Sequence, residues 1–143
     1  MLTVRDLMSA NPETISPDTL LRAVVEVMKV AGCRQLPVVD EHGRIIGIVT
    51  DRDVRLAMNS PMIMRSRWED EELVEKATVD SCMTPDPITI NSDAPAYRAA
   101  EILSTYKFGA LPVVDNGELV GIITVTDFLD RFTVQQPQNH TTS

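Results

Sequence analysis

The sequence predicts an α/β chain of the α+β type, built from two copies of one β-α-β-β-α motif. The main observation is an internal repeat: the five residues of Leu36–Asp40, Leu-Pro-Val-Val-Asp, recur at Leu111–Asp115. Further along, Gly47–Asp53 recurs as Gly121–Asp127, both reading Gly-Ile-(Val/Ile)-Thr-x-x-Asp. Motifs repeated in the same order indicate duplication of a whole structural unit. Each copy also places a helix-periodic stretch before two short β-rich runs, which predicts mixed helix and strand.

Each copy begins with a short extended piece and an amphipathic helix. The extended pieces are expected at Glu13–Ile15 and Ile88–Ile90, and the helices at about Thr19–Ala31 and Pro95–Tyr106. In the first copy, apolar residues fall on one face of the helix, as in a helix that packs on a core. Asp18 and Asp93 stand just before the helices, where an acceptor side chain is favoured, so both are predicted to be N-caps.

Two β-rich runs and a second helix complete each copy. The runs are Leu36–Asp40, Ile45–Thr50, Leu111–Asp115 and Leu119–Thr124. Glu41–Arg44 and the pair Asn116-Gly117 separate them and predict hairpin turns. The runs are almost continuously apolar, which is typical of strands covered on both faces. We therefore expect the two copies to pack against each other, and a further helix to follow Thr50 and Thr124.

These patterns divide the chain into four parts. The first motif is expected at 1–58 and the second at 79–134. Between them, 59–78 is rich in acidic residues and predicts a helical linker. The last part, 135–143, is polar and is expected to be disordered, since it offers little apolar surface to bury.

Composition narrows the classes of function. The formal net charge of −8 argues against a nucleic-acid partner, which requires a basic surface. The two cysteines and two histidines lack ligand spacing, so neither a metal site nor a disulfide is expected. The apolar runs are too short to span a bilayer, and the N-terminus carries no export signal. We expect a cytoplasmic protein that binds no membrane.

A threonine and an aspartate three residues apart are the candidate functional residues of each copy. Thr50 and Asp53 stand where the last β-rich run of the first copy passes into a helix, and Thr124 and Asp127 stand at the same place in the second. Two interpretations remain open. The pair can form a capping box that satisfies the first amides of the helix. Alternatively, the helix start can receive a phosphate while the carboxylate accepts hydrogen bonds from a ribose diol.

Further motifs make the pattern specific. Asp6-Leu7-Met8 and Ser81-Cys82-Met83 lead into the two copies, and both copies carry the two motifs described above. With these motifs the chain resembles a tandem pair of cystathionine-β-synthase (CBS) domains, a Bateman module, over Leu2–Phe132. The resemblance implies two motifs packed in pseudo-two-fold symmetry, a homodimer, and an adenosyl ligand in clefts between the motifs. The ligands it implies are AMP, ADP, ATP or S-adenosylmethionine.

The resemblance also implies roles for individual residues. Asp53 and Asp127 would bind ribose, with Thr50 and Thr124 beside them. The adenine would lie near the residues that precede each Leu-Pro pair: Cys33, Arg34 and Gln35 in one copy, and Phe108, Gly109 and Ala110 in the other. The segments Met8–Glu13 and Met83–Ile88 would form the remaining wall.

The two predicted sites differ in charge and in aromatic content. Arg34 and Arg52 of the first copy could pair with phosphate, and the second copy has no basic residue at the same positions. Phe108 could line an adenine pocket, but an aromatic residue at this point is expected rather in the core. One site is therefore expected to bind better than the other, and the sequence does not say which.

These observations together predict a non-catalytic regulatory module for an adenine nucleotide or another adenosyl ligand, which needs no cofactor. No Ser/His/Asp or Cys/His set can be assembled, because His42 lies in a predicted turn and His140 in the polar tail. The glycine-rich phosphate loops of nucleotide-hydrolysing and dinucleotide-binding enzymes are also missing. The alternative is a structural dimerisation or docking module with vestigial pockets. The sequence does not identify the regulated partner.

Overall fold

The computed structural model describes residues 1–58 and 76–133. These residues form two compact units. The first unit is Glu13–Pro87, and the second unit joins Met1–Pro12 to the chain from Ile88 onward. The predicted tail at 135–143 and residues 59–75 of the predicted linker lie outside the described residues. The predicted α+β class is confirmed, because each unit combines helices with a three-stranded sheet.

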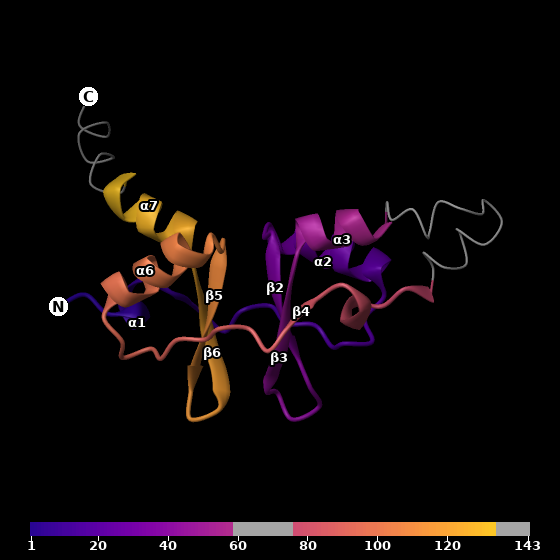
Figure 1. Ribbon diagram of the computed structural model, residues 1–143, viewed down its shortest axis with the longest axis horizontal. Coiled ribbons are helices and arrows are strands. Elements are labelled where there is room, and N and C mark those ends of the chain that lie inside the picture. Colours follow the sequence, from indigo (N-terminus) through magenta and orange to yellow (C-terminus); the bar gives the residue numbers. More distant parts are fainter. Residues whose placement is uncertain (59–75, 134–143) are drawn as a thin grey trace. The chain divides into compact units, whose positions relative to one another are not determined.

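The first unit consists of a β-hairpin and two helices, and the helices lie at the open end of the hairpin, opposite the hairpin turn (Figure 1). Its elements in chain order are α2 (Leu21–Ala31), β2 (Gln35–Val39), β3 (Ile45–Thr50), α3 (Asp51–Met58), the 3-10 helix η1 (Val79–Ser81) and β4 (Thr84–Pro85). The strands form one antiparallel sheet in the order β2-β3-β4. The strands of the hairpin lie where the β-rich runs predict them.

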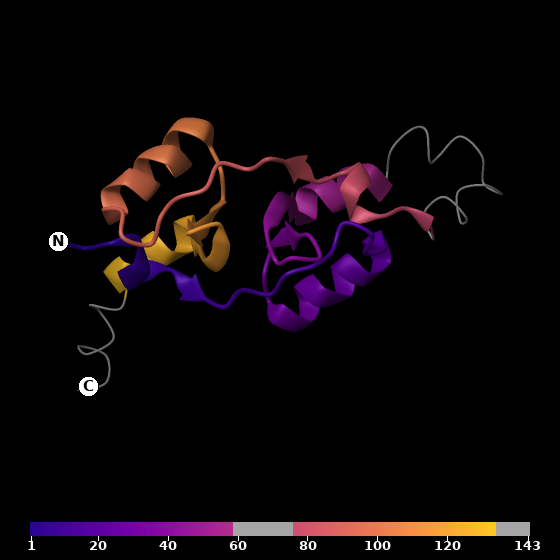
Figure 2. The same ribbon diagram turned by 90° about the horizontal axis from the view of Figure 1, so that it is seen from below.

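The second unit repeats this plan. Its elements are α1 (Val4–Leu7), β1 (Ser9–Ala10), α6 (Ala96–Tyr106), β5 (Ala110–Asp115), β6 (Glu118–Thr124) and α7 (Val125–Thr133). The sheet order is β1-β6-β5, and α1 lies beside α7 (Figure 2). Asn116 and Gly117 have φ values of +53° and +82°, as a two-residue hairpin turn of type I′ requires, so this predicted turn is confirmed.

The segments that lead into the two repeats are exchanged between the units. Strand β1 precedes the first repeat in sequence, but it pairs with β6 of the second unit, where Ala10 lies opposite Gly121. Strand β4 precedes the second repeat, but it pairs with β3 of the first unit, where Pro85 lies opposite Gly47. The compact units therefore cut across the motif boundaries at 58 and 79 that the repeat predicts.

Glycine makes room for each exchanged strand. A Cβ on Gly121 would stand 2.6 Å from Sδ of Met8 and 2.9 Å from the carbonyl oxygen of Ser9. At the equivalent Gly47, a Cβ would stand 2.5 Å from Sδ of Met83. At Gly121 the backbone oxygen leaves no room for a Cβ, whereas at Gly47 the nearest atom belongs to the flexible Met83 side chain and the nearest backbone oxygen, of Thr84, would stand at 3.1 Å. The strand crossing therefore requires glycine at Gly121 and favours it at Gly47.

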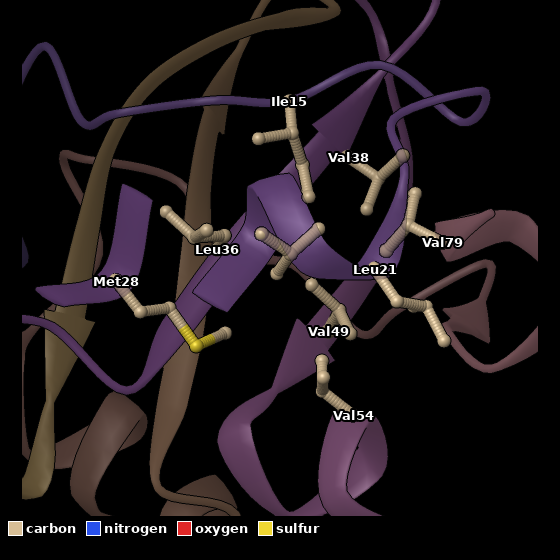
Figure 3. Close-up of a cluster of buried hydrophobic side chains, with 9 residues drawn as sticks. Ile15, Leu21, Met28, Leu36, Val38, Val49, Val54 and Val79 are labelled. Atoms are coloured by element: carbon tan, nitrogen blue, oxygen red, sulfur yellow. The ribbon is translucent and has the colours of Figure 1, made fainter. Parts of the chain in front are cut away.

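Each unit has its own hydrophobic core, and each core contains one valine from an exchanged segment. The core of the first unit, shown in Figure 3, consists of Ile15, Leu21, Val24, Met28, Leu36, Val38, Val49, Val54 and Val79. The core of the second unit consists of Val4, Ile90, Ala99, Leu103, Leu111, Val113 and Ile123. Val4 and Val79 are both 0% exposed, so the exchanged segments are integral parts of the units that receive them.

The exchanged segments also explain why the predicted N-caps are wrong. Helices α2 and α6 begin after Leu20 and Pro95, and neither Asp18 nor Asp93 caps them. The first helical amides instead reach the exchanged segments: Leu21 donates to the Ala77 carbonyl at 3.0 Å, and Ala96 donates to the Leu2 carbonyl at 2.9 Å. Because backbone carbonyls already satisfy these amides, a side-chain cap is unnecessary.

A polar cluster fastens the exchanged segment of the second unit. Nη2 of Arg5 donates to Oγ of the fully buried Ser92 at 2.7 Å, and Nη1 lies 2.9 Å from the Asp93 carboxylate. Ser92 in turn donates its amide to Asp115 at 2.9 Å and its hydroxyl to the same carboxylate. These two bonds hold the pKa of Asp115 below its ordinary value. The first unit has Asp80 and Pro17 at the places of Arg5 and Ser92, so it lacks this cluster.

The ends of α2 and α6 supply a matched stability test. Gly32 ends α2 with φ of +68°, and Lys107 ends α6 with φ of +60°. Because a side chain makes this left-handed conformation costly by about 1 kcal/mol, Lys107→Gly is expected to raise the free energy of unfolding by about that amount. Gly32→Ala is expected to lower it similarly, since no atom lies within 4 Å of the added Cβ and only the backbone cost remains. Urea denaturation measures both changes, and effects of the same sign would contradict the explanation.

Candidate functional site

The junctions between β3 and α3 and between β6 and α7 carry the predicted threonine and aspartate pairs. The Thr50 amide donates to Oδ2 of Asp53 at 3.0 Å, and the Asp53 amide donates to Oγ1 of Thr50 at 3.1 Å. In the second unit the Thr124 and Asp127 pair makes the same bonds at 2.8 and 3.2 Å. The capping-box interpretation is therefore confirmed for both junctions.

The capping box occupies only part of each carboxylate. Oδ2 makes the bond to the threonine amide, while Oδ1 of Asp53 and of Asp127 accepts no hydrogen bond from any residue within 1–58 and 76–133. Both side chains are half-buried and so reach the surface. A carboxylate can accept several hydrogen bonds. Each acid is thus held in a fixed orientation with one oxygen available to a ligand, and the two interpretations of the pair are compatible.

Backbone bonds bring the start of the preceding strand to each junction. The Asp51 amide donates to the Arg34 carbonyl at 2.9 Å, and the Val125 amide donates to the Gly109 carbonyl at 3.0 Å. In the strand register, Gln35 is paired with Thr50 in the first unit. Ala110 is likewise paired with Thr124 in the second unit. The structure therefore gathers Arg34, Gln35, Thr50 and Asp53 at one junction, and Gly109, Ala110, Thr124 and Asp127 at the other.

The first turn of each helix keeps one donor available. The amides at Asp51 and Asp53 are used as described, while the amide of Arg52 finds no acceptor in the described part of the chain. Thr126 holds the same position at the start of α7. Arg34 and Arg52 are exposed, and neither side chain makes an ion pair with a described residue. The first junction thus presents an amide, a helix start and two cations, a combination that suits an anionic group.

The three residues before each Leu-Pro pair differ between the two units in burial and in packing partners. Cys33 is half-buried and packs against the core of the first unit. Phe108 is 36% exposed, lies outside the core of the second unit, and stacks on Tyr106 with ring centroids 5.3 Å apart. The expectation that Phe108 is a core aromatic is therefore wrong. The ring has a surface partner that the sequence pattern does not reveal.

The segments Met8–Glu13 and Met83–Ile88, which the resemblance assigns to the wall of the sites, each contain one residue of unusual backbone conformation. After β1 and β4 the chain bends at Asn11 and Asp86, which have φ values of +51° and +46°. These two residues occupy equivalent places, and their amides donate to the Val120 and Ile46 carbonyls. A left-handed conformation at a non-glycine residue is uncommon, because it costs conformational free energy and persists only where the surrounding structure holds it in place. The sequence signal for such a bend is the residue type, because Asn and Asp tolerate the left-handed conformation better than other residues with a side chain.

Cys82, from the motif Ser81-Cys82-Met83, is a half-buried thiol that packs against the core of the first unit. Burial, together with the negative charges of Asp53 and Asp80, raises the pKa of its thiol to about 11. Burial also raises the pKa of Cys33, with Glu13 as the nearby acid. Both thiols are therefore protonated at neutral pH, and Cys82 lies within electrostatic reach of the candidate ribose-binding acid.

The reactivity of Cys82 is expected to report the charge on Asp53. Because the thiolate is the nucleophile, alkylation by iodoacetamide should be slow at neutral pH and should rise with pH toward about 11. Asp53→Asn removes one charge that raises this pKa, so Cys82 should react faster in the variant at mildly alkaline pH. Cys33 is the internal control, since Glu13 and not Asp53 influences it. Peptide mass spectrometry follows both residues, and an unchanged Cys82 rate would show that the two groups are not coupled.

Within 1–58 and 76–133, no three His, Cys, Asp or Glu side chains gather closely enough to hold a metal ion. No helix in the same ranges has the length and apolar character needed to cross a membrane.

Comparison with known proteins gives the family. A family model of the CBS domain matches residues 4–60 and 79–133. A CBS domain-containing protein of Dictyostelium discoideum is 38% identical over 128 residues, which are 89% of this chain and 88% of that protein. The inosine-5'-monophosphate dehydrogenase of Aquifex aeolicus is 32% identical over 126 residues. These are 87% of this chain but only 23% of that enzyme.

Solved structures agree with the sequence relatives. The crystal structure of CBSX2 of Arabidopsis thaliana in complex with AMP has a TM-score of 0.77 and 28% identity. The match covers 96% of this chain and 99% of that one. The CBS domain pair of protein MJ0100, in complex with 5'-methylthioadenosine and S-adenosyl-L-methionine, has a TM-score of 0.79 and 28% identity. That match covers 94% of this chain and 98% of the pair. The chain therefore belongs to the CBS domain family, of which it carries two copies in tandem.

Proposed function

We propose that this chain is a regulatory module that binds an adenosyl ligand of the class of AMP or S-adenosylmethionine. The observation that carries the proposal is the likeness to CBSX2 in complex with AMP, which extends over nearly the whole of both chains. The CBS pair of MJ0100 adds two ligands that share adenine and ribose with AMP and differ from it at the 5' position. We therefore propose that adenosine is the part of the ligand that is recognised.

The available atoms at the junctions suggest how recognition works. Oδ1 of Asp53 and of Asp127 would accept hydrogen bonds from ribose hydroxyls while Oδ2 keeps the cap. Hydrogen bonds to a charged acceptor contribute about 1.5–3 kcal/mol each, enough to favour a ribose over a deoxyribose. The amide of Arg52 and the guanidinium groups of Arg34 and Arg52 would face a 5'-phosphate in the first unit.

We further propose that binding occurs without turnover of the ligand. The dehydrogenase relative matches this chain over 23% of its length, so its activity is not carried over to this chain. Regulation would arise because the ligand binds two arrangements of the module with different affinity. We place the module in the cytoplasm, acting on a partner protein that the chain itself does not identify.

A structural role is the second candidate, and the complete capping boxes favour it. In this alternative the threonine and aspartate pairs serve only to start α3 and α7, and the module acts as a dimerisation or docking piece. Both candidates predict loss of stability when Asp53 is replaced by alanine. Only the regulatory candidate predicts an effect on a ligand.

Isothermal titration calorimetry tests the proposed function directly. AMP, ADP, ATP and S-adenosylmethionine are titrated into the purified protein, with GMP as the control for adenine. Saturable binding of at least one adenosyl ligand, and weaker binding of GMP, is the expected result. Failure of all four to bind at millimolar concentration would remove the regulatory proposal and leave the structural role. Native mass spectrometry of the freshly purified protein would identify a ligand carried over from the host.

A further inference from the structure

The two exchanged segments reach their units through matching backbone bonds. We call them the 2–10 segment and the 77–85 segment. Each donates two amides to carbonyls just before the first long helix of the receiving unit, at 2.9 and 3.0 Å. The donors and acceptors are Val4 to Ala94, Arg5 to Ser92, Val79 to Thr19 and Asp80 to Pro17. Because the two core valines are also equally buried, a difference in attachment must arise from other side chains or from the local helix.

A polar side-chain bond fastens the 2–10 segment and has no counterpart in the first unit. The Arg5 guanidinium donates to Oγ of Ser92 at 2.7 Å, and Ser92 is fully buried. A bond from a charged donor to a buried hydroxyl is one of the stronger polar contacts. The ion pair of Arg5 with Asp93 is exposed and contributes less. The first unit has Asp80 and Pro17 at the two places, which supply neither a cation nor a hydroxyl.

The local helices differ in the same direction. In the 2–10 segment, α1 is a turn of α-helix, and the Thr3 amide donates to Oδ2 of Asp6 at 2.8 Å. In the 77–85 segment, η1 is a 3-10 turn, and Ser81 stands at the place of Asp6. A 3-10 turn has poorer hydrogen-bond geometry than an α-helical turn. The 77–85 segment is thus less stabilised both in its own helix and in its attachment.

We infer that the 77–85 segment detaches from the first unit by local unfolding, while the 2–10 segment stays attached to the second unit. Local opening occurs where the free-energy cost is smallest, and it leaves the rest of the unit folded. Detachment exposes the buried Val79 to water, so the detached state is a minor population in equilibrium with the attached one.

Detachment would change both the first junction and the connection between the units. The thiol of Cys82 lies within electrostatic reach of Asp53, and Met83 lies against Gly47 of β3. Because the second unit resumes at Ile88, detachment also lengthens the free chain that joins the two units. The next step rests on the proposed function. A ligand that binds the first junction only in the attached state would oppose detachment, and the segment would be the element that responds to the ligand.

Native-state hydrogen exchange compares the two segments in the ligand-free protein. The amides of Val79 and Asp80 should show protection factors at least about tenfold lower than those of Val4 and Arg5. Their exchange should also depend weakly on urea, because detachment exposes little surface. Equal protection of the two pairs, or a urea dependence at Val79 as steep as that in β3, would overturn the inference.

Variants of the fastening residues test the cause of the difference. Arg5→Ala should lower the protection of the Val4 amide by about tenfold, because the bond to the buried hydroxyl is lost. The reverse change, Asp80→Arg combined with Pro17→Ser, should raise the protection of the Val79 amide. Asp80→Ala combined with Pro17→Ser is the control without the cation. If Arg5→Ala had no effect at Val4, or if both double variants protected Val79 equally, the inference would be wrong. Far-ultraviolet circular dichroism verifies that the variants are folded.

A measurement with ligand separates this inference from the proposed function. Hydrogen exchange is repeated with whichever of AMP, ADP, ATP and S-adenosylmethionine binds most tightly, at about 100 times its Kd. Exchange of the Val79 amide should slow by up to about 100-fold, because only the attached state binds. Binding without any slowing at Val79 would refute the coupling and leave the proposed function intact. If none of the four binds, the proposed function fails, and the ligand-free comparison still decides whether the segment detaches.

Discussion

Replacing Val4 by alanine is expected to destabilise the half of the protein that lies farther from it in sequence. Val4 belongs to the exchanged segment that precedes the first repeat, but its side chain is 0% exposed in the core of the second unit. Truncating a buried valine should lower the free energy of unfolding of that unit by about 1–3 kcal/mol. Native-state hydrogen exchange should show the loss of protection in β5 and β6.

Val79→Ala is the matched variant for this experiment. Val79 occupies the equivalent place in the second leading segment and is also 0% exposed, but it packs in the core of the first unit. Its replacement should accelerate exchange in β2 and β3. The pair of variants thus produces crossed effects, each on the unit that receives the segment. If Val4→Ala affected β2 and β3 more than β5 and β6, the exchange of segments would be wrong.

Asp53→Asn and Asp127→Asn are expected to weaken binding of an adenosyl ligand by about 10- to 100-fold at the altered site. The amide oxygen of asparagine can still accept the bond from the Thr50 or Thr124 amide, so the cap and the fold should survive. The second oxygen and its charge are lost, and with them the acceptor offered to the ribose. Calorimetry with the tightest of the four adenosyl ligands measures the change.

Asp130→Asn is the control for charge, because it makes the same substitution on the exposed side of α7 away from the junction. It should leave the affinity unchanged. If the two site variants also bound ligand as the wild type does, the aspartates would serve only as caps. The purely structural role would then be the better description of both junctions. A difference between Asp53→Asn and Asp127→Asn would show which unit holds the stronger site.

Much of the fold follows from local patterns in the sequence. The four hairpin strands occur within one residue of the predicted runs, since β-rich segments bounded by turn residues specify strands locally. The turn at Asn116 and Gly117 is confirmed for the same reason. The capping boxes are also local, because they join residues three apart.

The exchange of leading segments was not predictable, because the information needed is not local. Val4 and Met8 have the same spacing as Val79 and Met83, so either segment matches either sheet. The failed N-cap predictions have the same origin. A carbonyl from a distant segment takes the bond that the pattern assigned to an aspartate.

The candidate site shows a different limit of sequence reasoning. A threonine and an aspartate three residues apart fit a cap and a ligand site equally well, and the structure shows that a cap leaves Oδ1 available. Phe108 escaped prediction because its stacking partner, Tyr106, lies outside the motif that drew attention to Phe108. Residue identity alone therefore could not separate a buried ring from a surface pair.

Because of the exchanged segments, the strands of the two sheets become available for pairing at different stages of synthesis. Glu13–Pro87 is continuous in sequence, so all three strands of its sheet are available once Pro87 has left the ribosome. Residues 1–12 are made before β6 and must wait for it before they find their sheet. Until then β1 has an unpaired edge and Val4 is exposed to water, so this segment is protected later than the unit that follows it in sequence.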